Sequence, residues 1–284
     1  MRINHSLLPM IDYHKAKVLM WDPRTIDLDQ DRRDWATMAE SERDLILRVA
    51  ALFHAGEEAV AHDLAPLLVA VRRAGGHLED EFFLTTQIFE EAKHMEFFDR
   101  WLDEVIGGPI DLLSYLGPSY GPVFFEALPR SLNRLLTDAS ARAQVEASVI
   151  YHMIIEGVLA ETGYHGFYQA LKARGLLPGL VQGIELVQRD EARHIAFGVY
   201  FLQRHVQAEP ALWDVIEARM AELLPAALDV VGDTFMPYGD DIPFNLDVAE
   251  MITYASDQFN KRLSAVERAR ARATTESQPL IPEA

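Results

Sequence analysis

The sequence of 284 residues contains no cysteine, which excludes disulfide bonds and thiolate metal ligands. Its apolar runs are short, and the run from Leu64 to Val71 is interrupted well before the roughly 20 residues that a membrane-spanning helix needs. No positively charged leader followed by an apolar segment opens the chain. We therefore expect a soluble, cytoplasmic protein without a membrane span.

Positive charge is scarce as well. The chain has 26 Lys and Arg against 44 Asp and Glu, which gives a formal net charge of −18. A surface of this sign repels the phosphate backbone of DNA or RNA, so the composition argues against nucleic acid as a partner.

Linkers are also missing. No Gly/Ser-rich or low-complexity segment divides the chain, and 49% hydrophobic residues can fill one sizeable core. We predict one helical domain over residues 1–270 and a disordered polar tail over 271–284. No stretch alternates between apolar and polar residues as a strand does, so the predicted fold is all-α.

Apolar residues at helical spacing, interrupted by glycine and proline, predict the helices. Residues 1–39 are expected to be irregular and to pack Trp21 and Trp35 across the bundle. A kink is expected at Pro66 and a helix cap at Asp138. The helices are predicted at about 41–74, 80–106, 122–136, 138–174, 180–206, 210–234 and 247–270.

Two of these helices carry a glutamate three residues before a histidine. The pairs are Glu91 with His94 and Glu191 with His194. Residues three apart share one face of a helix, so each pair can hold the same ion. Such a pair is also common on helix surfaces, and neither pair alone predicts a metal site.

The wider spacing is more informative. Glu57 lies 34 residues before Glu91, and Glu156 lies 35 residues before Glu191, which is the pattern of a repeated helical hairpin. Two Glu-x-x-His helices with a single glutamate on each of two further helices form the ligand set of dinuclear carboxylate sites in four-helix bundles. The pattern therefore predicts six metal ligands: Glu57, Glu91, His94, Glu156, Glu191 and His194.

The predicted ligands balance in charge. Four buried carboxylates bring a charge of −4 that two divalent cations neutralise, while the imidazoles contribute neutral nitrogen. Oxygen-rich ligation with two imidazoles suits iron or manganese. Asp190 is expected to accept the free N–H of a ligating histidine, from the opposite hairpin. We interpret His54, His62, His152 and His165 as core or surface residues.

The chain resembles the ligand-binding oxidases related to the ribonucleotide reductase small subunit, from about Trp21 to about Arg262. The resemblance is carried by Phe53-His54-Ala55-Gly56-Glu57-Glu58-Ala59-Val60, Phe89-Glu90-Glu91-Ala92-Lys93-His94, Ile155-Glu156-Gly157, Thr162-Gly163-Tyr164 and Asp190-Glu191-Ala192-Arg193-His194. It implies a ferritin-like four-helix bundle with additional helices, a homodimer, and a manganese–iron centre that activates dioxygen. It also implies a long-chain fatty-acid-like ligand beside the metals, in a tunnel for which Val60 and Phe197 are candidate lining residues.

The same resemblance implies an ether crosslink between the Cβ atom of Val60 and the phenolic oxygen of Tyr151, formed by two-electron oxidation. Tyr164 matches a further tyrosine near the site, for which a redox role and a buried structural role both remain open. Tyr151 stands five residues before Glu156, so sharing a face with Glu156 requires local unwinding of the helix or a side chain that reaches back.

Two other functions remain in competition. A true reductase small subunit, which stores a radical for a large partner, commonly has a tyrosine where this chain has Phe98, and it has a relay tyrosine near its end. Here Tyr254 is the last tyrosine. A metal-storage or purely structural bundle is the other alternative, and it would bind many ions per chain or none.

Overall fold

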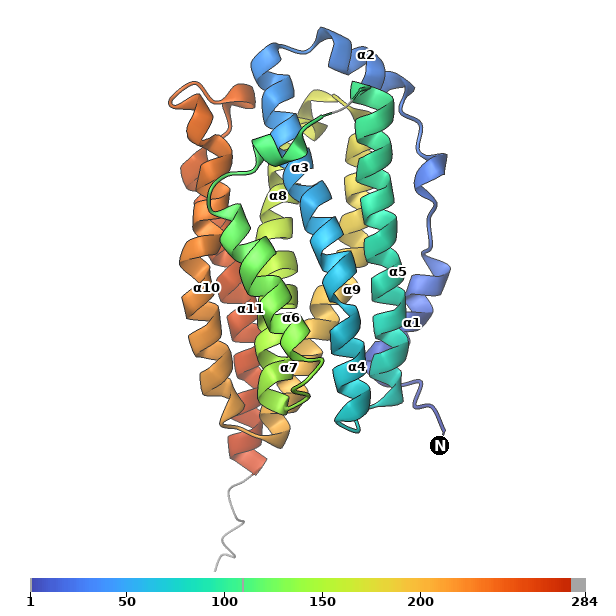
Figure 1. Cartoon of the computed structure of the whole chain (residues 1–284), viewed down its shortest axis with the longest axis vertical. Helices are drawn as coiled ribbons and strands as arrows, with labels where there is room; N and C mark the ends of the chain where they lie inside the picture. Colours follow the sequence, from blue (N-terminus) through green and yellow to red (C-terminus); the bar gives the residue numbers. More distant parts are fainter. Residues whose placement is uncertain (1, 109, 277–284) are drawn as a thin grey trace, which may run out of the picture.

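The computed structural model describes residues 2–108 and 110–276. Within these ranges every regular element is helical and no strand is present. The long helices run side by side along the vertical axis of Figure 1 and enclose one continuous apolar core. In this part of the chain no helix is long and apolar enough to cross a membrane.

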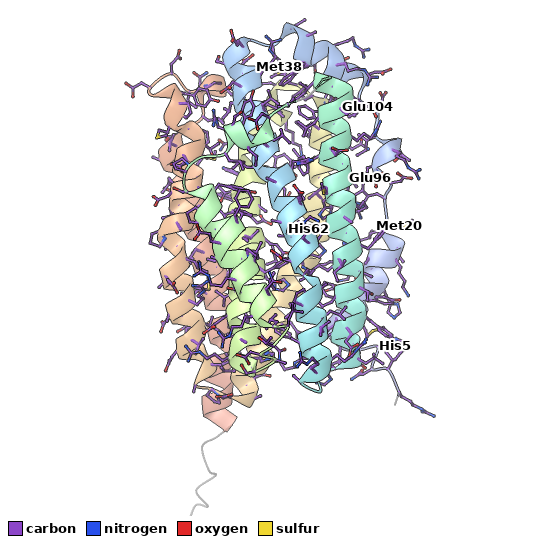
Figure 2. The ribbon with its side chains drawn as sticks, viewed as in Figure 1. His5, Met20, Met38, His62, Glu96 and Glu104 are labelled. Carbon is purple, nitrogen blue, oxygen red and sulfur yellow. The ribbon has the colours of Figure 1, made fainter. Side chains whose placement is uncertain are left out.

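Four helical rods surround the centre of the bundle. They are α3 (Glu40–Asp63), α5 (Leu78–Trp101), the continuous rod formed by η5 (Val149–Ala160) and α8 (Glu161–Ala170), and α9 (Pro178–Ala208). Helices α10 (Leu212–Phe235) and α11 (Val248–Glu276) pack against η5 and α9, and they form the orange and red side of Figure 1. Exposed side chains such as His62, Glu96 and Met20 lie around the outside (Figure 2).

Shorter elements connect the rods. Pro66 starts a new helix instead of kinking a continuous one, because α3 ends before it and the proline occupies the first turn of the next helix. The connecting helices are α4 (Ala65–Arg73), η2 (Leu102–Ile106), η3 (Leu112–Tyr115), η4 (Pro122–Ala127), α6 (Leu128–Arg134), α7 (Ala141–Ser148), η6 (Lys172–Arg174), η7 (Met236–Tyr238) and η8 (Pro243–Asn245).

The start of the chain differs from the irregular lead-in that the sequence predicts. It contains α1 (Leu8–Val18), η1 (Pro23–Thr25) and α2 (Asp29–Thr37). Helix α2 is almost entirely polar, so it has no apolar periodicity from which a helix could be predicted. Tertiary contacts hold it in place. Asp31 accepts hydrogen bonds from Trp101 and from the backbone N–H groups of Gly179 and Leu180 at the start of α9.

The helix after Asp138 also begins differently from the prediction. Ser140 is its N-cap and accepts the N–H of Ala143, while Asp138 accepts the N–H of Ser140. At the other end of the chain, α11 continues to Glu276, six residues beyond the predicted helix end. Residues 277–284 of the predicted tail lie outside the described residues.

Segment η5 is a π-helix of 12 residues that follows directly on α7 and continues into α8. A π-helix bonds each carbonyl to the N–H five residues later, which brings residues five apart towards the same face. Tyr151 and Glu156 are five apart and both lie in this segment. The local change of helix type therefore lets both side chains point at the centre of the bundle.

Candidate metal centre

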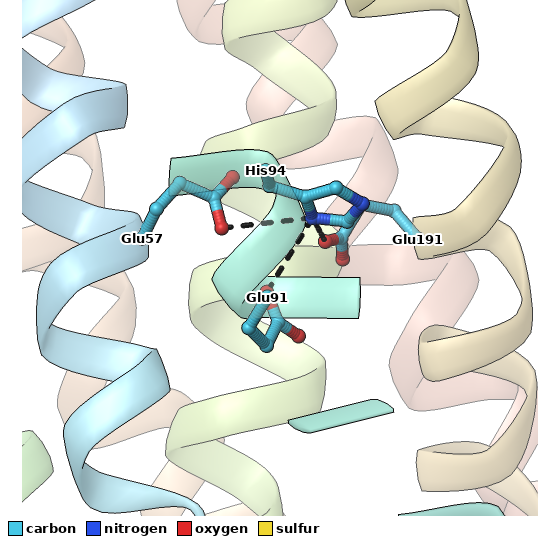
Figure 3. Close-up of side chains that lie close together, drawn as sticks. All are labelled: Glu57, Glu91, His94 and Glu191. Atoms are coloured by element: carbon cyan, nitrogen blue, oxygen red, sulfur yellow. Dashed lines mark ion pairs between the residues drawn. The ribbon is translucent and has the colours of Figure 1, made fainter. Parts of the chain in front are cut away.

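Six side chains from four rods converge at the centre of the bundle. Ligand atoms of Glu57, Glu91, His94 and Glu191 lie within 4.8 Å of one another, and so do those of Glu91, Glu156, Glu191 and His194. Figure 3 shows the first group, with Glu57 on α3, Glu91 and His94 on α5, and Glu191 on α9. Glu91 and Glu191 belong to both groups.

The imidazoles present their Nδ1 atoms to the shared space. Nδ1 of His94 lies 3.2 Å from Glu191 Oε1 and 3.6 Å from Glu91 Oε2. Nδ1 of His194 lies 3.1 Å from Glu91 Oε1 and 3.4 Å from Glu191 Oε1. The two oxygens of Glu91 thus face one histidine each.

The convergent atoms lack ordinary partners. Among the described residues, both Nδ1 atoms and one oxygen each of Glu57, Glu156 and Glu191 are buried without a hydrogen bond. A buried polar atom without a partner is costly, and five such atoms in two overlapping groups of side chains call for cations that accept electron pairs from them. A pair of metal cations fits this donor set of oxygen and imidazole nitrogen.

The charges in the cluster perturb one another strongly. Burial raises the pKa of Glu57 to about 8 despite the nearby imidazole of His94, and burial together with Glu191 raises the pKa of Glu156 well above its usual value. Burial also opposes ionisation of His94, but Glu57, Asp190 and Glu191 raise the pKa of this imidazole well above 6.5. Protons therefore occupy the cluster where cations could sit.

Each imidazole directs its other nitrogen, Nε2, at a carboxylate from the opposite hairpin. Nε2 of His94, on α5, lies 3.4 Å from Asp190 Oδ2 on α9. Nε2 of His194, on α9, lies 2.9 Å from Glu90 Oε2 on α5. Arg193 ties the two acceptors together through contacts with Asp190 and Glu90. Such outer carboxylates orient metal-ligating imidazoles and fix their tautomer.

The sequence favoured Glu91 over Glu90 as the ligand and indicated no role for Glu90 or for Gln87. Glu90 directly precedes Glu91 as Asp190 directly precedes Glu191, so the repeat itself could have indicated the role of Glu90. Gln87 lies one turn earlier on α5, and its amide donates a hydrogen bond of 2.9 Å to Glu156 Oε1. Gln87 and Glu156 are far apart in the sequence, so no spacing between them predicts this hydrogen bond.

The remaining candidate residues border the cluster. The hydroxyl of Tyr151 donates to Glu91 Oε1 at 2.9 Å, and Val60 is buried on α3 one turn after Glu57. Tyr164 is buried too, and its hydroxyl has no hydrogen-bond partner among the described residues. Its ring stacks on Phe53, with ring centroids 5.1 Å apart.

An apolar cavity extends from the cluster along α3. Glu57, Glu91, Glu156 and Glu191 line one end, and Val60 and Tyr164 stand beside them. The lining continues along α3 to Leu45, which is about 18 Å from Glu57 at 1.5 Å per residue, and includes Val230 and Phe235 of α10. No Lys, Arg or His belongs to the lining among the described residues. Phe197, a predicted lining residue, packs instead on Phe83 with ring centroids 4.5 Å apart.

The other histidines lie outside both ligand groups. His62 is exposed, whereas His152 is buried against Ser148, and burial lowers its pKa to about 3. His165 stacks on Tyr254, and Nε2 of His54 lies 3.7 Å from Asp99. Their positions match the core and surface roles that the sequence predicts.

Comparison with known proteins agrees with this geometry. The family model described as "Ribonucleotide reductase, small chain" matches residues 10–269. A solved structure described as "R2-like ligand-binding oxidase with aerobically reconstituted Mn/Fe cofactor (long soak)" is 38% identical, with a TM-score of 0.89. Another, with "aerobically reconstituted metal cofactor after photoconversion", is also 38% identical and has a TM-score of 0.88. In both cases the match covers 93% of this chain and 94% of the other.

These matches confirm the all-α, ferritin-like fold and the resemblance predicted from the sequence. They cover nearly the whole length of both chains, so they include all four rods and the helices around them.

Proposed function

Because this chain belongs to the ribonucleotide reductase small-chain family, and within it to the ligand-binding oxidases, we propose that it is a dioxygen-activating oxidase with a dinuclear manganese–iron centre. The observation that carries the proposal is the convergence of buried, unpartnered carboxylate and imidazole atoms from four rods. The proposed ligands are Glu57, Glu91, His94, Glu156, Glu191 and His194.

Glu91 and Glu191 would help to hold both cations, since each belongs to both ligand groups. His94 and His194 bind through Nδ1, while Asp190 and Glu90 hold their Nε2 nitrogens and keep the rings oriented. Gln87 holds Glu156 in place. When bound, the metal pair supplies activation of dioxygen for two-electron oxidation of a C–H bond.

We further propose that the cavity holds a long-chain fatty-acid-like ligand. Its walls are apolar along about 18 Å of α3, which suits an acyl chain. Since none of the described lining residues is basic, an acidic head group finds its countercharge only at the metal end. Tyr164 lines the cavity and offers its unpartnered hydroxyl to the ligand or to a redox step.

A crosslink between Val60 and Tyr151 is proposed as one product of this chemistry. The Cβ–H bond of Val60 and the O–H bond of Tyr151 would break and an ether C–O bond would form, with two protons released and two electrons taken up by the oxidising capacity that the metal pair and dioxygen would supply. Glu91 already accepts the hydrogen bond of the phenol and is placed to receive its proton. We also propose one domain over residues 1–270 and a homodimer.

The family match also suits a reductase small subunit, which is the competing function. Phe98 offers no hydroxyl for a stored radical, and its ring stacks on Phe53. No tyrosine follows Tyr254 in the sequence. Assay with a purified large subunit and a nucleotide separates the two functions, because only the reductase function predicts reduction of the nucleotide.

The exposed neighbour of Glu57 provides a matched test. Glu57 and Glu58 are adjacent, but only Glu57 is buried and faces the cluster. After loading with manganese and iron in air, elemental analysis is expected to find two ions per chain in the wild type and in Glu58→Gln, and fewer in Glu57→Gln. Equal metal content in both variants would contradict the proposed ligand set.

A further inference from the structure

A tryptophan from the start of the chain is connected to the metal centre by hydrogen bonds. Nε1 of Trp21 donates to Asp190 Oδ2 at 2.7 Å, and the same oxygen lies 3.4 Å from Nε2 of His94. The indole ring also lies roughly parallel to the imidazole of His94, with centroids 6.3 Å apart. Trp21 follows Met20, which Figure 2 places on the outer side of the bundle.

Trp21 differs from the other three tryptophans in its exposure to solvent. It is partly exposed, whereas Trp35, Trp101 and Trp213 are at most 9% exposed. An indole is among the more easily oxidised side chains in this chain without cysteine. Trp21, whose ring lies beside the proposed ligand His94, is therefore also the tryptophan that solvent reaches, and it offers a path by which oxidising equivalents could leave the centre.

The buried ammonium group of Lys93 lies beside Trp21 and Asp190. Lys93 is 4% exposed, and its Nζ lies 4.7 Å from the centre of the Trp21 ring. The same ammonium donates at 2.6 Å to Asp190 Oδ2, the oxygen that accepts the indole N–H. Lys93 thus touches both the donor and the acceptor of the hydrogen bond that leads to His94.

The charge of Lys93 acts on the oxidation of Trp21. A cation is attracted by the electron-rich face of a neutral indole. Loss of an electron makes the ring positive and replaces this attraction by repulsion at short range in a partly buried place. The second hydrogen bond to Asp190 Oδ2 also withdraws negative charge from the acceptor of the indole proton.

We propose that Lys93 insulates Trp21 from the metal centre, so that oxidising equivalents stay in the cavity and do not escape to the surface. The inference rests on the proposed function in one respect, namely that the centre becomes oxidising in air. Lys93 is then a positioning residue that protects the protein and takes no part in the reaction itself.

The reaction that Lys93 opposes leaves a stable product. Trp21 would lose one electron to the oxidised centre and its N–H proton to Asp190, from which the proton passes to water. Loss of a second electron and addition of one water would give hydroxytryptophan, with two electrons accepted by the centre and two protons released in all. Peptide mass spectrometry detects this product as one added oxygen atom on the peptide that contains Trp21.

The first experiment uses protein loaded with manganese and iron and then exposed to air. Lys93→Met removes the charge at similar length, and Lys93→Arg retains it. We expect several-fold more oxygen on Trp21 in Lys93→Met than in the wild type, and restored protection in Lys93→Arg. Equal oxidation of Trp21 in all three proteins, at equal metal content, would overturn the proposal.

The second experiment does not depend on the metals. Azide radicals from pulse radiolysis oxidise tryptophan in metal-free protein, and the buried Trp101 peptide serves as the internal reference. Trp21 is expected to react several-fold faster in Lys93→Met than in Lys93→Arg, and an unchanged rate would overturn the proposal. Should Lys93→Met not fold, as judged by circular dichroism, Lys93→Gln takes its place in both experiments.

The two experiments separate this proposal from the proposed function. If the wild type bound no metal, the proposed function would fail, while the radiolysis result would still decide whether Lys93 controls the oxidation of Trp21. If radiolysis showed the effect but loaded Lys93→Met remained unmodified in air, the insulating role towards the centre would be wrong.

Discussion

Glu90 Oε2 lies 2.9 Å from Nε2 of His194, although the two residues belong to helices of different hairpins. The converse contact joins Asp190 on α9 to Nε2 of His94 on α5. Each hairpin therefore carries a histidine and also the carboxylate that orients the histidine of the other hairpin. The geometry of the site depends on both hairpins being docked together.

The crossed arrangement predicts that Glu90→Gln weakens metal binding without removing a ligand. Loss of an outer carboxylate typically lowers metal affinity by about 10–100-fold, because the imidazole loses its orientation and part of its basicity. Competition titration with a chelator measures the affinity. Glu96→Gln, an exposed change on the same helix, is the control and is expected to have no effect. Equal affinity of the two variants would contradict an orienting role for Glu90.

The raised pKa of Glu57 predicts how stability depends on pH. Because this group has a pKa of about 8 when folded and 4.5 as its ordinary value, the folded metal-free protein binds the proton more tightly than the unfolded chain. Its contribution to stability is complete below about pH 4.5 and is lost as the pH rises through about 8. The raised pKa values of Glu156, His94 and His194 act in the same direction.

Bound cations replace these protons, so the stabilisation by metal should grow between about pH 5 and about pH 8. Thermal unfolding of loaded and metal-free protein measures it. A change of 1 kcal/mol corresponds to about 2–4 °C in Tm for domains somewhat smaller than this one, which is within reach of the measurement. A Tm difference that stays constant or shrinks with rising pH would speak against cations in the cluster.

Tyr151→Phe is expected to abolish the crosslink while leaving the metal content at two ions per chain. The phenol supplies the oxygen of the ether, but it is a hydrogen-bond donor to Glu91 and not a proposed ligand. Intact mass after aerobic loading detects the loss of two hydrogens in the wild type. Tyr164→Phe serves as the control and should still lose two hydrogens on aerobic loading. If the mass of this variant did not change, the crosslink would depend on Tyr164 as well, which would contradict the proposal.

Gly166→Leu should close the apolar cavity without disturbing the metals. Gly166 lines the cavity, and a Cβ atom added there makes only an ordinary contact with Met251 Sδ at 3.9 Å, so the backbone position has room for a side chain that fills the cavity. Mass spectrometry of extracted lipids is expected to find less bound acyl ligand, with unchanged metal content. Gly232→Ala, which has open space around the added atom and lies outside the lining, is the control.

The sequence predicted most of the long helices because their apolar positions follow a regular period, and it placed the six candidate ligands on them. The hairpin repeat made Glu57 and Glu156 stand out among 44 acidic residues. Helix α2 was missed because nearly all of its residues are polar, and its position depends on Asp31 binding the start of α9. Long-range contacts of this kind leave no local pattern.

The π-helical segment was equally invisible, since its residues satisfy a helical pattern of either type. The sequence raised the question of how Tyr151 could share a face with Glu156, and the answer lies in backbone geometry. Trp21 and Lys93 are far apart in the chain and come together only in the folded protein, where both donate to Asp190 and the ammonium lies over the indole ring, so no local sequence pattern connects them.

The most direct test of the dinuclear centre is a crystal structure of aerobically loaded protein with anomalous data at the manganese and iron edges. We predict two separate metal peaks, one beside His94 and one beside His194, each close to Glu91 and Glu191. Absence of transition-metal density between these histidines in loaded protein, or a single ion bound elsewhere, would contradict it.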